Sequence, residues 1–179
     1  MIANILNAIT LSRIFCAILI YLILFLESNY SLALFLFFVA SFSDFLDGYL
    51  ARKTDSVSIL GEILDPIADK LLIVFVLIGL SINLDSFLIG FISAIIISRE
   101  IWVAALRDIN SRNNQSDKTK VTFLAKTKTA IQMLSIFMYI LGLTINNMVV
   151  LFFADIILII ALLVTIQTGF QYTISTFKK

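Results

Sequence analysis

Two pairs of aspartates stand among otherwise apolar residues in the first half of the chain, between positions 44 and 69. The first pair, Asp44 and Asp47, is spaced by three residues, so a helix would place both on one face. The second pair, Asp65 and Asp69, is spaced by four residues, with the same consequence. Carboxylates crowded in a low-dielectric setting repel one another and become protonated unless a positive charge compensates them. The sequence therefore predicts a cation site between two facing helices.

The chemistry of the available ligands narrows the choice of cation. The chain has no histidine and a single cysteine, so oxygen ligands dominate, and these favour the hard cations Mg²⁺ or Mn²⁺. Small residues accompany the acids: Gly48 and Ala51 share the face of the first pair, and Gly61 shares that of the second. Small side chains let two helices approach closely. A solvated acidic loop is the alternative, but a loop has no reason to keep two helical faces.

These positions form the pattern D-x-x-D-G-x-x-A-R, eight residues, then G-x-x-x-D-x-x-x-D, with every fixed position matched. The pattern resembles the signature of the CDP-alcohol phosphotransferases. The resemblance implies transfer of a phosphatidyl or similar group from a CDP-activated donor to an alcohol, with release of CMP. It also implies two divalent ions, Mg²⁺ or Mn²⁺, in each protomer. The expected metal ligands are Asp44, Asp47, Asp65 and Asp69, with Asp69 as the candidate general base.

The donor is expected to bind along the same motif. Gly48 and Ala51 would leave room for cytidine, and Arg52 would contact the nucleotide or its phosphates. The full set of expected donor-binding residues is Asp44, Gly48, Ala51, Arg52 and Gly61.

A second set of polar residues is basic and contains Arg99, Arg107, Lys126 and Lys128. Arg99 lies about two turns inside the membrane, where an unpaired cation is costly. It therefore needs Glu100, a motif carboxylate or an anionic ligand. Arg99 and Arg107 are eight residues apart and share a helix face. The set is typical of a phosphate pocket, although Lys128 also fits the flanking charge common at a membrane edge.

Several segments resemble one branch of the family, the bacterial phosphatidylglycerophosphate synthases. They are N-x-x-N-x-x-T-x-x-R from Asn4 to Arg13, Leu64–Lys70, Arg99-Glu100 with Arg107, and Ala125–Ala130. The resemblance extends from residue 4 to about residue 143. Ile5 departs from it, because the branch commonly has proline there.

This narrower resemblance implies a reaction between CDP-diacylglycerol and sn-glycerol 3-phosphate that gives phosphatidylglycerophosphate and CMP. It further implies a homodimer. The residues expected to hold the acceptor phosphate are Arg99, Arg107 and Lys126, together with Thr10 and Arg13.

The composition places these residues in a membrane. Hydrophobic residues make up 60% of the chain and charged residues 14%, with a mean hydropathy of +1.04, whereas soluble domains carry roughly a quarter charged residues. Six apolar runs could each span a bilayer: Ile9–Leu26, Tyr30–Leu50, Leu60–Ile82, Ser86–Leu106, Ala125–Leu143 and Met148–Phe170. We predict an all-α, polytopic membrane bundle of six transmembrane helices, with a short surface helix at residues 1–8. Residues 1–179 would form one domain.

Lysine and arginine are distributed unequally between the two ends of this bundle. The connections Glu27–Asn29, Asn83–Asp85 and Asn146–Asn147 contain neither, whereas the other connections and the carboxyl terminus are basic. By the positive-inside rule the basic end is cytoplasmic. With the resemblance, this predicts a bacterial inner-membrane protein with termini and active site facing the cytoplasm. We expect the amino terminus to be retained, since it lacks a small-residue cleavage site.

Alternatives concern the acceptor and the class of protein. Within the family the acceptor could instead be phosphatidylglycerol, as in cardiolipin synthase, or serine or inositol phosphate, although a basic pocket counts against serine. From another class, a cation carrier could line its path with intramembrane charges, but it would not require glycine and alanine at fixed offsets from the acids. The expected partners are the two substrates, membrane lipid and a second copy of the chain, without nucleic acid.

Overall fold

The computed structural model describes residues 2–54, 59–113 and 123–178, and within these ranges all regular structure is helical. The helices are α1 (Ile2–Phe25), α2 (Tyr30–Thr54), α3 (Ile59–Asn83), α4 (Phe87–Arg112), α5 (Phe123–Thr144) and α6 (Met148–Phe177). At the end with the short connections, the helices agree with the predicted spans to within a few residues. At the basic end several helices, such as α1 and α6, extend beyond the predicted span. The prediction of an all-α helical bundle is confirmed.

The separate helix expected at residues 1–8 is corrected by the structure. These residues, from Ile2 onward, form the first turns of α1, which continues without a break to Phe25. No glycine or proline occurs between these two positions. Ile5 keeps the backbone donor that a proline would remove, so nothing in the sequence interrupts the helix.

Three short connections close the helical hairpins α1–α2, α3–α4 and α5–α6 in the same way. The residues in the left-handed conformation are Glu27 (φ 50°), Asp85 (φ 44°) and Asn146 (φ 51°). In the first turn, the amide of Glu27 donates to the Leu24 carbonyl and that of Ser28 to the Ile23 carbonyl, both at 3.2 Å. This is the Schellman arrangement, which satisfies the last carbonyls of a helix. The other two turns repeat it.

A polar side chain then starts the next helix after each turn. The Asn29 carboxamide oxygen accepts from the Leu32 amide at 3.0 Å, and the Ser86 hydroxyl oxygen accepts from the Ile89 amide at 3.3 Å. Asn147 does the same for α6. Such caps satisfy the free amides of a first helical turn, so the connections without lysine or arginine are short because their own residues close them.

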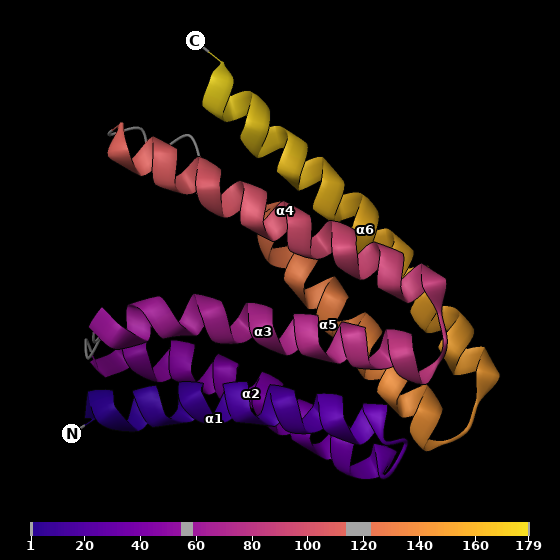
Figure 1. The fold of residues 1–179 in the computed structure, drawn as a ribbon. Coiled ribbons are helices and arrows are strands. Elements are labelled where there is room, and N and C mark those ends of the chain that lie inside the picture. Colours follow the sequence, from indigo (N-terminus) through magenta and orange to yellow (C-terminus); the bar gives the residue numbers. More distant parts are fainter. Residues whose placement is uncertain (1, 55–58, 114–122, 179) are drawn as a thin grey trace.

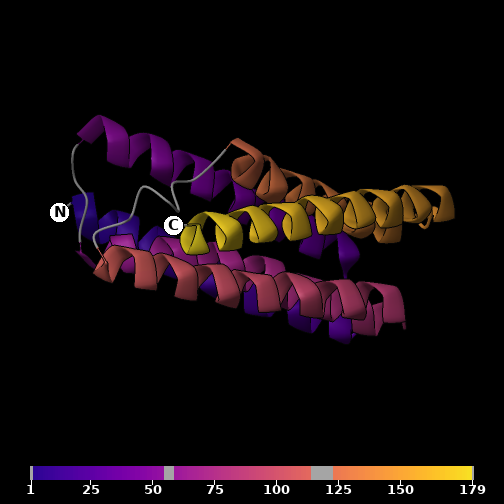
Figure 2. The same cartoon turned by 90° about the horizontal axis from the view of Figure 1, so that it is seen from above.

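Helices that follow one another in the sequence run antiparallel, and the bundle therefore has two different ends. The three capped turns lie at one end, and the start of α1 and the end of α6 lie at the other, as do the end of α2 and the start of α3 (Figures 1 and 2). Toward the end with the termini, α4 and α6 diverge from α3 (Figure 1). The contrast in charge noted in the sequence therefore coincides with a contrast in structure.

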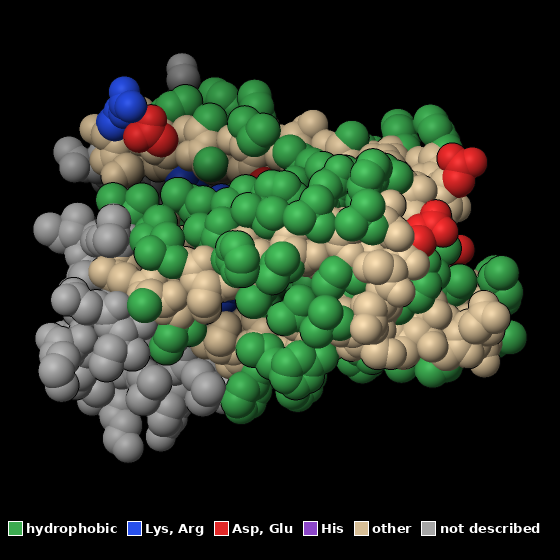
Figure 3. Space-filling view, turned by 60° about the horizontal axis from the view of Figure 1, so that its bottom comes forward, with side chains coloured by type: hydrophobic (Ala, Val, Ile, Leu, Met, Phe, Trp, Pro, Cys, Tyr) green, Lys and Arg blue, Asp and Glu red, His purple; other side chains and the backbone are tan. Residues whose placement is uncertain are grey.

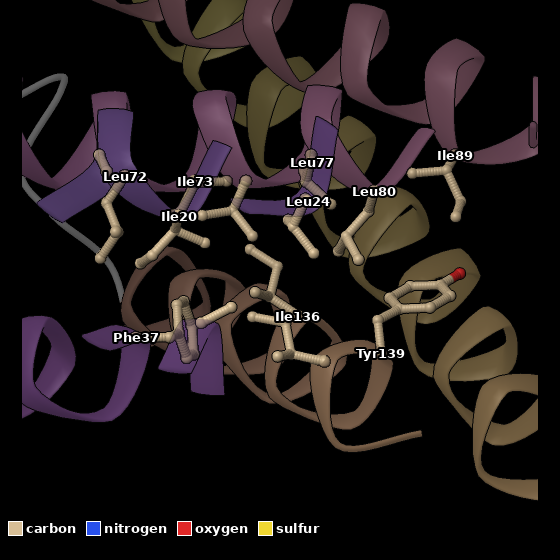
Figure 4. Packing of buried hydrophobic residues seen from close by; sticks show 14 of the residues in the cluster. Ile20, Leu24, Phe37, Leu72, Ile73, Leu77, Leu80, Ile89, Ile136 and Tyr139 are labelled. Carbon is tan, nitrogen blue, oxygen red and sulfur yellow. The ribbon is translucent and has the colours of Figure 1, made fainter. Parts of the chain in front are cut away.

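A continuous apolar core holds the bundle together. It takes buried side chains from all six described helices, among them Leu24 of α1, Phe37 of α2, Leu80 of α3 and Ile136 of α5 (Figure 4). The helix α1 packs on α2 and α3, and α5 packs on α2, α3 and α6. This packing fixes α1 against α3, where the second aspartate pair lies.

Large apolar side chains also cover the outside. On the face drawn in Figure 3, apolar side chains cover most of the middle, and the most prominent of the described charged side chains lie toward the two ends. Three helical stretches among the described residues are long and apolar enough to cross a membrane, namely 7–25, 87–112 and 148–177, and Tyr30–Ser43 is a shorter apolar stretch. The outer surface is therefore that of a membrane protein.

Truncating Leu80 to alanine should lower the free energy of unfolding by about 1–3 kcal/mol, less than the ~2–5 kcal/mol typical of soluble cores. The smaller cost is expected because lipid is as apolar as leucine, so packing is lost without a large transfer term. Thermal unfolding in detergent would measure it. Leu163→Ala is the matched control, because Leu163 is 61% exposed. Equal losses in both variants would contradict the assigned core.

Candidate active site

The second aspartate pair faces α1 at the end that holds the termini. The Thr10 hydroxyl donates to Oδ1 of Asp65 at 2.7 Å, and Nη1 of Arg13 donates to Oδ1 of Asp69 at 2.6 Å. The donors are three residues apart on α1 and the acceptors four apart on α3, so one face of each helix meets the other. The predicted common face of Asp65 and Asp69 is confirmed.

Burial explains why the contact with α1 matters. Arg13 is 1% exposed, whereas the Asp69 side chain is 32% exposed. A buried guanidinium is costly unless a carboxylate pairs with it, so Arg13 ties Asp69 to α1 while one side of the carboxylate remains accessible. Thr10 and Arg13 were expected to hold an acceptor phosphate. Here both contact the α3 carboxylates, and their contact with a phosphate stays a prediction.

The first aspartate pair belongs to α2, as expected. The side chains of Asp44, Asp47, Gly48, Ala51 and Arg52 lie outside the described residues, as does that of Lys126 in α5. Gly61 is in the first turn of α3. Among the side chains that the structure describes, no group of three or more metal-binding residues occurs. The described half of the expected metal site is therefore Asp65 and Asp69.

A cavity of about 510 Å³ connects this half-site with the basic residues. It lies between α3, α4 and α5, where α4 diverges from α3 (Figure 1). Its charged lining consists of Asp69, Lys70, Arg99, Glu100, Arg107 and Lys128. Residues far apart in the sequence thus share one space, in which Arg99 and Arg107 of the basic set meet Asp69 of the acidic motif.

Within the cavity Glu100 links two cations. Its Oε1 accepts from Nη1 of Arg99 at 2.8 Å and also from Nζ of Lys128. The Arg99 and Lys128 side chains are 9% and 7% exposed. A buried arginine needs an anionic partner, and the Glu100 carboxylate is that partner for Arg99. Lys128 is therefore part of the cavity wall and not a flanking charge at the membrane edge.

The cavity nevertheless keeps an excess of positive charge. Among the described side chains, its lining has four cations, Lys70, Arg99, Arg107 and Lys128, against two anions, Asp69 and Glu100, a formal excess of two positive charges. A phosphomonoester carries about −1.5 to −2 charges at pH 7. The cavity thus matches the charge of such a group.

The helix α6 contributes residues that the sequence did not single out. The Thr168 hydroxyl accepts from Nη2 of Arg99 at 2.8 Å, and the Tyr172 ring lies beside both Arg99 and Arg107. A Cβ added at Gly169 would come within 3.1 Å of Cγ of Arg99, so glycine leaves room for the arginine. In the sequence, only one pattern could have indicated that this face of α6 packs against polar groups. It is the helical repeat of small and hydroxyl residues at 165, 168, 169, 172 and 176.

Comparison with known proteins assigns the chain to one family. The family model described as CDP-alcohol phosphatidyltransferase matches residues 3–167. A Rickettsia bellii protein named CDP-diacylglycerol–glycerol-3-phosphate 3-phosphatidyltransferase is 39% identical over 172 residues, covering 94% of this chain and 93% of its own.

Proteins of the same name from other bacteria are also similar to this chain. The one from Wigglesworthia glossinidia brevipalpis is 38% identical over 75% of both chains, and that from Escherichia coli K12 is 30% identical over 74% of both. The matched region includes the aspartate motif, the lining residues of the cavity and α6 up to residue 167. This chain belongs to the CDP-alcohol phosphatidyltransferase family.

Proposed function

We propose that the protein transfers the phosphatidyl group of CDP-diacylglycerol to sn-glycerol 3-phosphate, giving phosphatidylglycerophosphate and CMP. The observation that carries the proposal is the shared cavity, in which Asp69 of the family motif meets an excess of two positive charges. The donor nucleotide would lie against the α2–α3 motif, and the acceptor phosphate against Arg99, Arg107 and Lys126. The names of the relatives support the same pair of substrates.

Arg99 has a donor left over for an anionic ligand. Its Nη1 and Nη2 bond to Glu100 and Thr168, whereas its buried Nε has no acceptor among the described residues. The Nε atom is enclosed beside Gly169 of α6, so a phosphate oxygen would accept from the second N–H of Nη1 or Nη2. Arginine suits this role because its planar guanidinium can bind a phosphate through two parallel hydrogen bonds.

The described donors fit a hard divalent cation. Asp65 and Asp69 present carboxylate oxygens from successive turns of α3, and Mg²⁺ and Mn²⁺ prefer such ligands. We assign their binding to Asp44, Asp47, Asp65 and Asp69, two ions in each protomer. When bound, the ions would neutralise the charge of the donor pyrophosphate and of departing CMP. Asp69 would take the proton of the acceptor hydroxyl, and the basic residues would hold that acceptor in place.

Exhaustive chelation should reduce CMP release to background, and Mg²⁺ or Mn²⁺ added back should restore it. The reason is that the motif offers only carboxylates, which repel one another unless a bound cation compensates their charge and aligns them. Thermal unfolding should be followed in parallel, because it separates a loss of metal from a loss of fold. Full turnover by the chelated, folded protein would refute metal dependence.

The acceptor is tested by giving purified protein CDP-diacylglycerol, a divalent cation and one acceptor at a time. We expect CMP release with glycerol 3-phosphate and none with serine. Release only with phosphatidylglycerol or inositol phosphate would replace the proposed substrate with a sibling one. If no CMP is released with any of the acceptors, the transferase assignment for this chain is overturned.

We also propose a bacterial inner-membrane location, with both termini and the active site on the cytoplasmic side, and a homodimer. Support for the orientation comes from the basic residues at the end with the termini and their absence from the three capped turns. A cytoplasmic cavity would also admit the water-soluble acceptor. The family resemblance supports the dimer.

Single cysteines introduced at two serines test this orientation. In a background carrying Cys16→Ser, a cysteine at Ser28 should react with a membrane-impermeant maleimide from outside spheroplasts, and one at Ser116 only after permeabilisation. Ser28 belongs to a capped turn that lacks basic residues, and Ser116 lies between α4 and α5. The opposite labelling would reverse the assigned topology.

A further inference from the structure

One aromatic ring of α6 contacts both arginines of the cavity. The guanidinium carbon of Arg99 lies 5.7 Å from the centroid of Tyr172, and that of Arg107 lies 5.5 Å from it. Both distances are within the ~6 Å at which a cation is attracted to an aromatic face. Tyr172 is 3% exposed, so the ring is itself held in place.

The position of the ring follows from the spacing of α4. Arg99, Val103 and Arg107 recur every four residues on one face, and Tyr172 packs with Val103 and Leu106 in a small buried cluster. The ring therefore lies against the turn that separates the two arginines. This lets a single side chain of α6 contact both cations.

The two arginines depend on the ring to different degrees. Arg99 is also held by Glu100 and Thr168. The Arg107 side chain is exposed, and the Tyr172 ring is its only hydrogen-bonding, ionic or ring partner among the described residues. A free arginine side chain has considerable rotamer freedom, so the ring is the element that restricts Arg107.

We propose that Tyr172 is a positioning residue for the acceptor site, which fixes the separation of Arg99 and Arg107 for a dianionic phosphomonoester. An aromatic ring contacts the flat face of a guanidinium, whereas the N–H donors lie in its plane. The ring can thus orient both groups and leave their donors available to phosphate oxygens. The inference rests on the proposed function, because it assigns these arginines to the acceptor.

Kinetics separate this role from a general effect on stability. Tyr172→Leu should raise the KM for glycerol 3-phosphate by about two- to thirtyfold, the range that corresponds to one or two cation–ring contacts. The KM for CDP-diacylglycerol should change less than twofold. Tyr172→Phe keeps an aromatic face and should restore the acceptor KM. Tyr172→Met serves as a second non-aromatic variant if the leucine variant does not accumulate in the membrane.

Tyr139→Leu is the matched control. Tyr139 is also a buried tyrosine, 1% exposed, and donates its hydroxyl hydrogen to Asp155 away from the cavity. This variant should lower thermal stability and leave both KM values unchanged. Equal changes in the two KM values of Tyr172→Leu, or failure of Tyr172→Phe to restore the acceptor KM, would overturn the inference.

A spectroscopic measurement distinguishes failure of this inference from failure of the proposed function. In ¹⁵N-arginine-labelled protein, the side-chain signals of Arg99 and Arg107 should show a ring-current shift that Tyr172→Phe keeps and Tyr172→Leu loses. If wild type releases no CMP with glycerol 3-phosphate, the proposed acceptor fails. The role of Tyr172 is then decided by titration with inorganic phosphate. Weaker phosphate binding in Tyr172→Leu would support it, and unchanged binding would refute it.

Discussion

Replacing Asp69 with asparagine should lower the rate of CMP release by about 10²–10⁴-fold, the range typical of a lost general base. Asparagine has nearly the same shape, and its carbonyl oxygen can still accept the hydrogen bond that Arg13 gives at 2.6 Å. It lacks the negative charge that would bind a divalent cation and the basicity that would take a proton. CMP release at saturating concentrations of both substrates measures the effect.

The control must separate chemistry from a general loss of negative charge at this end of the bundle. Asp108→Asn makes the same change on α4, where the 57% exposed carboxylate forms an ion pair with Arg112 outside the cavity. It should leave turnover within about twofold, because exposed pairs contribute little. Near-normal turnover of Asp69→Asn in folded protein would remove Asp69 from the mechanism.

The fold was largely predictable because the apolar runs and their interruptions are local signals. The turn residues Glu27, Asp85 and Asn146 interrupt the hydrophobic runs, and the structure shows that their backbone conformation closes the hairpins. The start of α1 was not predicted correctly. Its first turns have the composition of a surface segment, but they contain no residue that stops a helix, so the helix continues through them.

The acidic half of the site was predictable from spacing alone, since Asp65 and Asp69 must share a face of any helix that contains them. The residues that face this pair could not be predicted from spacing. Thr10 and Arg13 were expected at the acceptor phosphate, a role that stays a prediction, but their contact with the carboxylates follows only from the packing of α1 on α3. A helix-face argument gives the side on which a residue lies but not the helix that packs there.

The contribution of α6 was missed for a related reason. Its hydroxyl residues look like ordinary members of an apolar helix, because threonine in a membrane helix commonly donates to its own backbone. Thr168 does donate to the carbonyl of Val164, at 2.8 Å. Its oxygen also accepts from Arg99, which is 69 residues away. Only the tertiary packing of α4 on α6 reveals that second use.

Removing the Arg107 side chain should raise the KM for glycerol 3-phosphate about ten- to a hundredfold, because a charge-assisted hydrogen bond is worth roughly 1.5–3 kcal/mol. The KM for CDP-diacylglycerol should stay nearly unchanged. Arg107→Ala suits this test because the side chain lines the cavity but is exposed, and the Arg99, Glu100 and Lys128 contacts do not include it. A fall in kcat would mean that the contact strengthens in the transition state.

Two further variants make the result specific to the acceptor. Arg112→Ala removes an exposed arginine of the same helix that pairs with Asp108, and it should change neither KM. Arg52→Ala should do the reverse of Arg107→Ala and raise the donor KM, because Arg52 belongs to the motif that resembles a CDP-binding signature. Each outcome follows from a site of two half-pockets that share the motif carboxylates. If Arg107→Ala instead weakened donor binding alone, the basic cavity would belong to the nucleotide, and the excess positive charge would no longer argue for a phosphorylated acceptor.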